Sequence, residues 1–150
     1  MTRVCLVGKP DVELRYELVS RETSREALAT YDLREPYENT VAVETVSLGA
    51  AVSLLNDLAW YLVRFVDESL VFDPSIDDEE WLSRALAEAV RDGEVAPEET
   101  GRHLKVYGVD DGALREPMFV ARTGPELPEY DLHEVDETLV VRVTEAEFGA

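Results

Sequence analysis

The chain has 150 residues, 45% of them hydrophobic, which is enough for one domain with a buried core and excludes wholesale disorder. Its 33 carboxylates outnumber 14 basic side chains, and the net charge is −19. Because no local cluster of Lys and Arg accompanies this charge, direct nucleic-acid binding is disfavoured. Cys5 is the only cysteine, which excludes an internal disulfide and a multi-cysteine zinc site.

Apolar runs that would indicate export or membrane insertion are too short or too interrupted. The longest, residues 48–66, contains Asn56, Asp57 and Arg64, so we expect no membrane span. The run at residues 4–8 is too short for a signal peptide. We therefore expect a cytoplasmic protein.

The charge pattern favours a protein adapted to high salt. Only two lysines, Lys9 and Lys105, accompany twelve arginines, and the carboxylates are spread along the whole sequence as on a solvated folded surface. The Debye length falls from about 8 Å at physiological ionic strength to about 3 Å at 1 M, so molar KCl would screen the repulsion among carboxylates. This composition resembles that of haloarchaeal cytoplasmic proteins. The alternatives are an acidic mesophile protein and a GC-rich genome, although codon bias explains only the arginines.

The N-terminal part of the chain predicts two strands, a helix and one ambiguous segment. Residues 3–8 and 40–46 are β-branched runs typical of strands, and residues 34–39 predict a turn between elements. Residues 26–33 alternate in hydropathy, so we favour a strand there, with a helix as the alternative. Residues 11–21 predict a helix. Its expected cap and apolar face are Asp11, Val12, Tyr16 and Val19.

The strongest helical pattern covers residues 48–66, with Ser47 as its N-cap. The expected buried stripe is Leu48, Ala51, Val52, Leu55, Leu58, Ala59, Leu62, Val63 and Val66. Trp60, Tyr61 and Phe65 widen this apolar face, which would become a homodimer seam if one domain cannot cover it. Residues 70–72 predict a short strand.

Residues 77–92 predict a second helix, capped by Ser75 or Asp77 and ended by Gly93. Its expected buried stripe is Trp81, Leu82, Ala85, Leu86, Ala89 and Val90.

The C-terminal part predicts mainly strands. A helical turn at residues 97–99 precedes two hairpin arms, residues 103–109 and 114–122, around the turn Asp110-Asp111-Gly112. Pro117 places the second arm on an edge or at a bulge. Residues 138–144 predict the last strand.

These elements predict one α+β domain over residues 1–150, with a mixed or antiparallel sheet and two main helices. The order strand–helix–strand–strand–helix–strand approximates a ferredoxin-like core, to which a C-terminal strand extension would be added.

The residues with chemical potential do not form a catalytic, metal or nucleotide motif. Residues 7–9, Val-Gly-Lys, lack the second glycine and the hydroxyl of a phosphate loop, and a strand-ending turn is favoured. Cys5 lies mid-strand, which favours a buried structural role over a nucleophile. His103 and His133 lie thirty residues apart without metal-ligand spacing, so we expect separate surface histidines and no cofactor.

The most polar and aromatic loop, residues 34–39, offers a weak candidate binding surface. We assign Arg34 and Tyr37 to it, together with His103 if the fold brings that residue near. A hairpin turn is the simpler interpretation of the loop.

Three segments, VSLGAAVSLLNDLAWYLVRFVDESLV, EEWLSRALAEAVRDGEVAPEETGRHLKVYGV and TLVVRVTEAEF, carry a resemblance that extends over the whole chain. The chain resembles a family of uncharacterised haloarchaeal proteins of about this length, a domain of unknown function. The resemblance implies a halophilic origin, and it implies no activity, cofactor or site.

Three functional hypotheses follow. The leading one is a non-enzymatic interaction or regulatory module of a halophilic archaeon, with a protein partner or as a homodimer, in high KCl. The second is a small enzyme or small-molecule-binding protein whose site only the fold assembles. The third is an acidic nucleic-acid mimic, against which the even spread of carboxylates argues.

Overall fold

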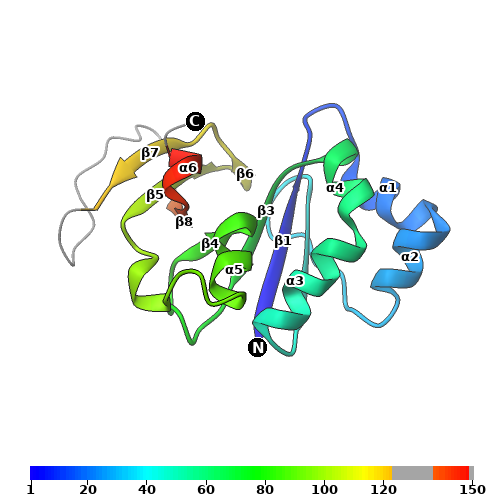
Figure 1. Ribbon diagram of the computed structural model, residues 1–150. Helices are drawn as coiled ribbons and strands as arrows, with labels where there is room; N and C mark the ends of the chain where they lie inside the picture. The colour runs from blue at the N-terminus through cyan, green and yellow to red at the C-terminus, as the bar shows by residue number, and fades with distance from the viewer. Residues whose placement is uncertain (123–136, 149–150) are drawn as a thin grey trace.

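One curled, mixed sheet organises the computed structural model, which describes residues 1–122 and 137–148 (Figure 1). The strand order is β2-β1-β3-β4-β8-β5-β6, with β7 paired beside β6 on the same edge of β5. Strands β4 and β8 run parallel, and the other paired strands run antiparallel. The strands are β1 Thr2–Gly8, β2 Thr40–Thr45, β3 Val66–Phe72, β4 Trp81–Ser83, β5 His103–Asp110, β6 Ala113–Leu114, β7 Met118–Ala121 and β8 Glu137–Val143.

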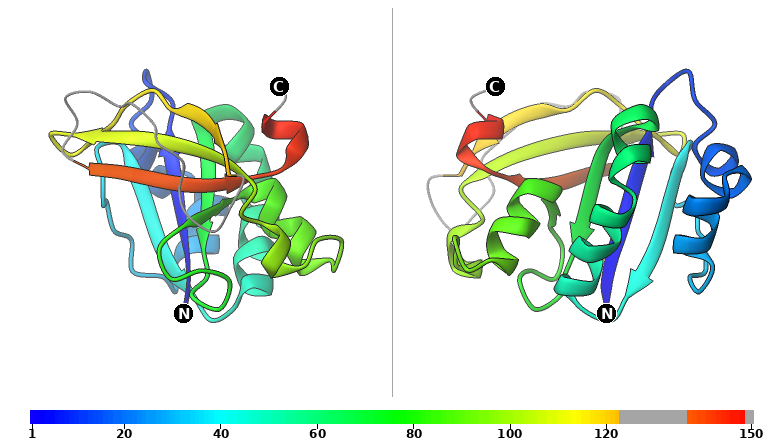
Figure 2. Two further views of the ribbon diagram at one scale, coloured as in Figure 1. Left: turned by 90° about the vertical axis from the view of Figure 1, so that its left-hand side faces the viewer. Right: turned by 45° about the vertical axis from the view of Figure 1, so that its right-hand side comes forward.

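Helices cover one face of the β2-β1-β3 part of the sheet, and α6 lies beside β5 (Figures 1 and 2). Alternation along β1 turns Val4 and Leu6 toward this helical layer, where they join Leu14, Leu55 and Leu86 in the main core. The helices are α1 Leu14–Ser20, α2 Glu22–Leu28, α3 Leu48–Asp57, α4 Ala59–Phe65, α5 Arg84–Arg91, the 3₁₀ turn η1 Pro97–Glu99 and α6 Glu145–Phe148.

A second core lies on the opposite face of β1 and β3, because the sheet curls over itself. Figure 2, left, shows β5 and β8 crossing over β1 and β3. The alternate residues Cys5 and Leu70 therefore pack against Tyr107, Val109 and Val141. The result is a single-domain α+β fold, as expected.

Several expected elements are confirmed where local signals were strong. Strands β1, β2 and β8 lie within a residue or two of the expected bounds, and η1 matches the expected turn. Ser47 caps α3 by accepting a hydrogen bond from the backbone N–H of Ala50. The hairpin turns at Asp111 and Gly112, both with positive φ, and its second arm breaks into β6 and β7 around Pro117.

The strand favoured at residues 26–33 is wrong, because α2 continues to Leu28 and the helical alternative holds for its first part. Ser24 explains the tight corner between α1 and α2, since its buried hydroxyl donates to the carbonyl of Leu18 at 2.5 Å. The expected face of α1 is also wrong. Leu14 and Leu18 are its buried residues, whereas Tyr16 is 62% exposed.

The two main helices are shorter than expected. The first breaks at Leu58 into α3 and α4, and Val66 already belongs to β3. The second begins only at Arg84, where Ser83 accepts the N-cap hydrogen bond from Leu86. Residues 81–83 are a strand because Leu82 is needed between β3 and β8.

The ferredoxin-like core is not confirmed. A split βαβ unit contains parallel strands joined through a helix. Here β1 lies between β2 and β3 and runs antiparallel to both.

Candidate functional site

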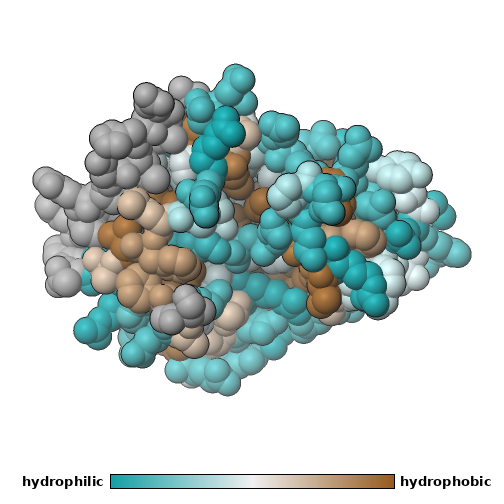
Figure 3. Space-filling view, turned by 90° about the horizontal axis from the view of Figure 1, so that it is seen from above, coloured by the Kyte–Doolittle hydropathy of each residue, from teal (hydrophilic) through white to brown (hydrophobic). Residues whose placement is uncertain are grey.

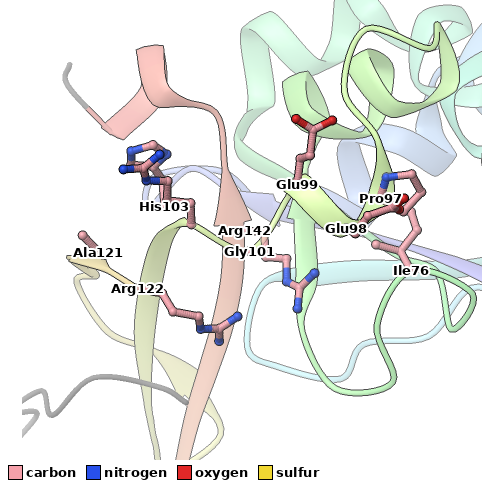
Figure 4. Close-up of a pocket in the computed structure, with 10 residues that line it drawn as sticks. Ile76, Pro97, Glu98, Glu99, Gly101, His103, Ala121, Arg122 and Arg142 are labelled. Atoms are coloured by element: carbon pink, nitrogen blue, oxygen red, sulfur yellow. The ribbon is translucent and has the colours of Figure 1, made fainter. Parts of the chain in front are cut away.

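A hollow of about 1000 Å³ opens where the start of β5, the end of β7 and the end of β8 meet the loop around η1 (Figure 4). Its volume is at the upper end of the range typical of small-molecule sites. We call it the arginine pocket, after the residues Arg102, His103, Arg122 and Arg142 in its lining.

The charge of the lining is the reverse of that of the chain. Three arginines and His103 stand beside two glutamates, Glu98 and Glu99, whereas carboxylates outnumber basic residues 33 to 14 overall. Glu99 is also committed to local structure, because its carboxylate accepts the backbone N–H of Ala96 at 3.2 Å.

Arg142 is held in a fixed orientation by three partners. Its Nε donates to Glu80 at 2.8 Å, one Nη to Asp77 at 3.1 Å and the other Nη to the hydroxyl of Thr100 at 2.9 Å. The side chain is only 11% exposed. Such a guanidinium loses little further freedom when a ligand binds.

Arg122 approaches the same carboxylate from β7 and retains an unused donor. Its Nη2 donates to Glu80 at 2.5 Å, and its side chain is 12% exposed. Its Nε is buried and has no hydrogen-bond partner in the described structure. Figure 4 shows the guanidinium groups of Arg122 and Arg142 pointing toward one another. Because unpaired buried donors are uncommon, this Nε marks a place where an acceptor is missing.

Gly101 makes the close approach of these side chains possible. A Cβ at this position would lie 2.9 Å from Nη1 of Arg122 and 3.4 Å from the guanidinium carbon of Arg142. A larger residue would therefore push the two guanidinium groups out of place.

Asp77 supports the pocket from outside. Desolvation alone would raise its pKa, but the backbone N–H groups of Glu80 and Glu79 and the charges of Arg142 and Arg122 outweigh it. The net pKa is lowered, so Asp77 remains ionised and keeps Arg142 in position.

A second hollow, of about 750 Å³, lies near the other end of β5 and has a different character. Lys105 donates to Glu68 at 2.5 Å, and the hydroxyl of Tyr107 donates to the same carboxylate oxygen at 3.2 Å. Burial, followed by the charge of Glu68, raises the pKa of Tyr107 well above its usual range. Because Glu68 accepts from both groups, this network is internally satisfied.

The candidate binding residues from the sequence lie at two places. His103 lines the arginine pocket and contacts the Phe148 ring, with centroids 4.9 Å apart. Arg34 is exposed and paired with Asp32, while Tyr37 is half-buried. The loop of Tyr37 lies beside the β5–β6 turn, since the N–H of Glu38 donates to the carbonyl of Gly112. That turn is about 20 Å along β5 from His103.

Two other sequence expectations concern reactive groups. Cys5 is 1% exposed, and desolvation raises its pKa to about 12 despite an opposing hydrogen bond with Thr40, so the buried structural interpretation is confirmed. His133 lies outside the described residues, so the expectation of separate histidines stays a prediction.

The sequence pattern did not single out Arg122, Arg142 or Glu80. A signal was present in TLVVRVT, where Arg142 interrupts an otherwise apolar strand and so requires a buried anionic partner. That the partner is Glu80, 62 residues away, depends on the parallel pairing of β4 and β8.

Among the described residues, no group of His, Cys, Asp and Glu side chains is arranged to hold a metal ion. None of the helices in the described ranges is long and apolar enough to cross a membrane.

Comparison with known proteins identifies the family. The model of DUF5804, a family of unknown function, matches residues 2–109, which are more than two thirds of the chain. The chain therefore belongs to this family. No curated protein and no solved structure matches it.

Proposed function

We propose that this member of DUF5804 is a non-enzymatic binding module that takes a small multivalent oxyanion, a carboxylate or a phosphate, in the arginine pocket. The observation that carries the proposal is the buried, unpartnered Nε of Arg122 in a lining where basic residues outnumber acidic ones. Of the hypotheses from the sequence, the proposal keeps the regulatory module and takes its ligand class from the small-molecule alternative.

The chemistry of the lining supports an oxyanion over chloride, which is abundant in molar KCl. Guanidinium groups present donors in a planar fork that matches two oxygens of one ligand, which a spherical ion cannot use. Arg122 and Arg142 are held in advance by Glu80, and the exposed Arg102 adds a third guanidinium at the rim.

Calorimetric titration in molar KCl tests this function, with phosphate, succinate and citrate as probes. We expect at least one probe to bind, and Arg102→Gln and Arg122→Gln to weaken it about tenfold or more, as for loss of a charge-assisted contact. Arg91→Gln is the matched control, because Arg91 is an exposed arginine on α5 paired only with its neighbour Asp92. Recovery of unchanged probe would favour binding over the enzymatic alternative.

Two results would reject the pocket. One is that none of the three probes binds, and the other is that both pocket variants bind as the native chain does. Arg102→Gln keeps the test decisive if Arg122→Gln fails to fold, because Arg102 is exposed.

We further propose that the protein works in the salt-rich cytoplasm of a haloarchaeon. Its only two lysines support this, because each has a specific contact. Lys9 Nζ donates to the carbonyl of Val63 at 3.2 Å, and Lys105 pairs with Glu68. The freely exposed cations of the described surface are arginines, as expected if lysine is retained only where its contacts require it.

Protein association is a second candidate function, which the surface of α4 favours. Trp60 and Val63, both expected to be covered, are 48% and 73% exposed. A protein partner or a second copy of the chain would remove this apolar area from water.

A further inference from the structure

The outer side of α4 combines exposed apolar groups with cations. Trp60 and Val63 are three residues apart, so they lie on the same side of the helix. Beside them lie Lys9, Arg21 and Arg64, and we call these five residues the α4 patch. Figure 3 shows apolar residues as brown islands in a mostly hydrophilic surface when the molecule is viewed from above.

The cations are fixed against the apolar groups. The guanidinium of Arg64 lies 3.7 Å from the ring centroid of Trp60, and that of Arg21 lies 5.7 Å from it. Arg64 also donates to the carbonyl of Trp60 at 3.1 Å, and Lys9 donates to that of Val63 at 3.2 Å. These contacts place positive charge directly next to exposed apolar surface.

Two of these cations lack a carboxylate. Arg21 pairs with Glu17 at 3.0 Å, but no ion pair joins Lys9 or Arg64 to a carboxylate of residues 1–122 or 137–148. In a chain with 33 carboxylates and 14 basic residues, uncompensated cations next to an exposed indole are unexpected. An anionic partner would complete the patch.

We infer that the α4 patch docks an acidic segment of a partner protein, which places an apolar side chain on Trp60 and Val63 and carboxylates on Lys9 and Arg64. This inference rests on the second proposed function, protein association, and specifies the chemistry of the partner. A symmetric contact with a second copy would instead bring Arg64 and Lys9 toward their own counterparts, and like charges oppose that arrangement.

Fluorescence of Trp60 provides the test. The chain has two tryptophans, and Trp81→Phe leaves Trp60 as the only reporter in an otherwise complete protein. The probe is a hexapeptide with two glutamates on each side of a Leu-Phe pair. Its control has glutamines in place of the glutamates, and both are titrated at low and at molar KCl.

We expect a saturable blue shift with the acidic peptide and binding about tenfold or more weaker for the glutamine peptide at low salt, because charge complementarity supplies the difference. Arg64→Gln and Lys9→Gln should each weaken the acidic peptide about threefold or more. Arg91→Gln, on α5, should leave it unchanged.

Three outcomes would overturn the inference and separate it from protein association itself. Equal binding of both peptides would leave α4 as an association surface without acidic selectivity. A dimer seen by light scattering at the working salt, and lost in Val63→Glu, would make the partner a second copy. A monomer that binds neither peptide would remove both the inference and the second proposed function.

Discussion

The side-chain oxygen of Asn39 accepts a hydrogen bond from the backbone N–H of Leu14 at 3.0 Å, so helix α1 begins on a side chain from 25 residues away. The amide nitrogen of Asn39 donates to the carbonyl of Lys9, also at 3.0 Å. Glu13, in the N-cap position, provides no side-chain cap. Asn39 thus takes over the role that the sequence assigned to Asp11.

Replacing Asn39 with alanine should cost about 1–2 kcal/mol, as for loss of a cap and of a buried hydrogen bond. Its positive φ of 55° adds strain for alanine. Urea unfolding in molar KCl measures the effect. Asn56→Ala is the control, because Asn56 is exposed and accepts only from Arg84 at the surface. Equal losses at both positions would contradict the capping role.

Glu80 and Glu79 form a matched pair for the arginine pocket. Glu80→Gln leaves Arg122 and Arg142 without their shared carboxylate, and removal of one partner from a buried ion pair costs about 3–5 kcal/mol. Glu79 is exposed, so Glu79→Gln should stay within about 0.5 kcal/mol. The free energy of unfolding in molar KCl measures both. A similar small loss in the two variants would mean that Glu80 does not organise the arginines.

Leu55 and Leu86 were expected at the centres of the two helical stripes, and their exposures of 0% and 3% confirm their burial. Replacing either with alanine should cost about 2–5 kcal/mol through lost burial and the cavity left behind. Val63→Ala, at a 73% exposed position of α4, should change stability by less than about 0.5 kcal/mol. Losses below about 1 kcal/mol at both leucines would contradict this packing.

Stability should increase with salt. The melting temperature should rise steeply between about 0.1 and 2 M KCl, because screening removes repulsion among carboxylates that have few basic partners. Sodium chloride should act nearly as well, since screening does not distinguish the two cations. A melting temperature that stays flat over this range would reject the halophile proposal.

Cys5 predicts an alkaline limit. Because its folded pKa of about 12 is raised above the ordinary value of 9.0, its contribution to stability is complete below pH 9 and is lost as the pH rises toward 12. Tyr37 and Tyr107, whose pKa values are raised from 10.0, add to the loss only above pH 10. Urea unfolding between pH 8 and pH 10 should show declining stability in the native chain and a flatter profile in Cys5→Ala. Parallel profiles would exclude Cys5 as the cause.

The sequence predicted elements whose signals are local. Ser47, Gly93 and the Asp110-Asp111-Gly112 turn fix caps and reversals through their own backbone and side-chain geometry, and all lie as expected. The β-branched runs of β1, β2 and β8 were equally clear.

Elements decided by tertiary contacts were not predictable in this way. Residues 81–83 have a helical pattern, but Leu82 pairs with Val71 on one side and Arg142 on the other. The arginine pocket depends on the same pairing, because only β4 beside β8 brings Glu80 to Arg142. Of the pocket, the sequence supplied only His103 as a candidate.

The position of β8 in the sheet has a consequence for synthesis on the ribosome. Strands β1 to β4 and strands β5 to β7 are connected by hydrogen bonds only through β8, within the described sheet. Residues 137–143 are translated after every strand that they join. The nascent chain must therefore hold the free edges of β4 and β5 apart from other chains until β8 emerges, and its dense negative charge provides that protection through mutual repulsion.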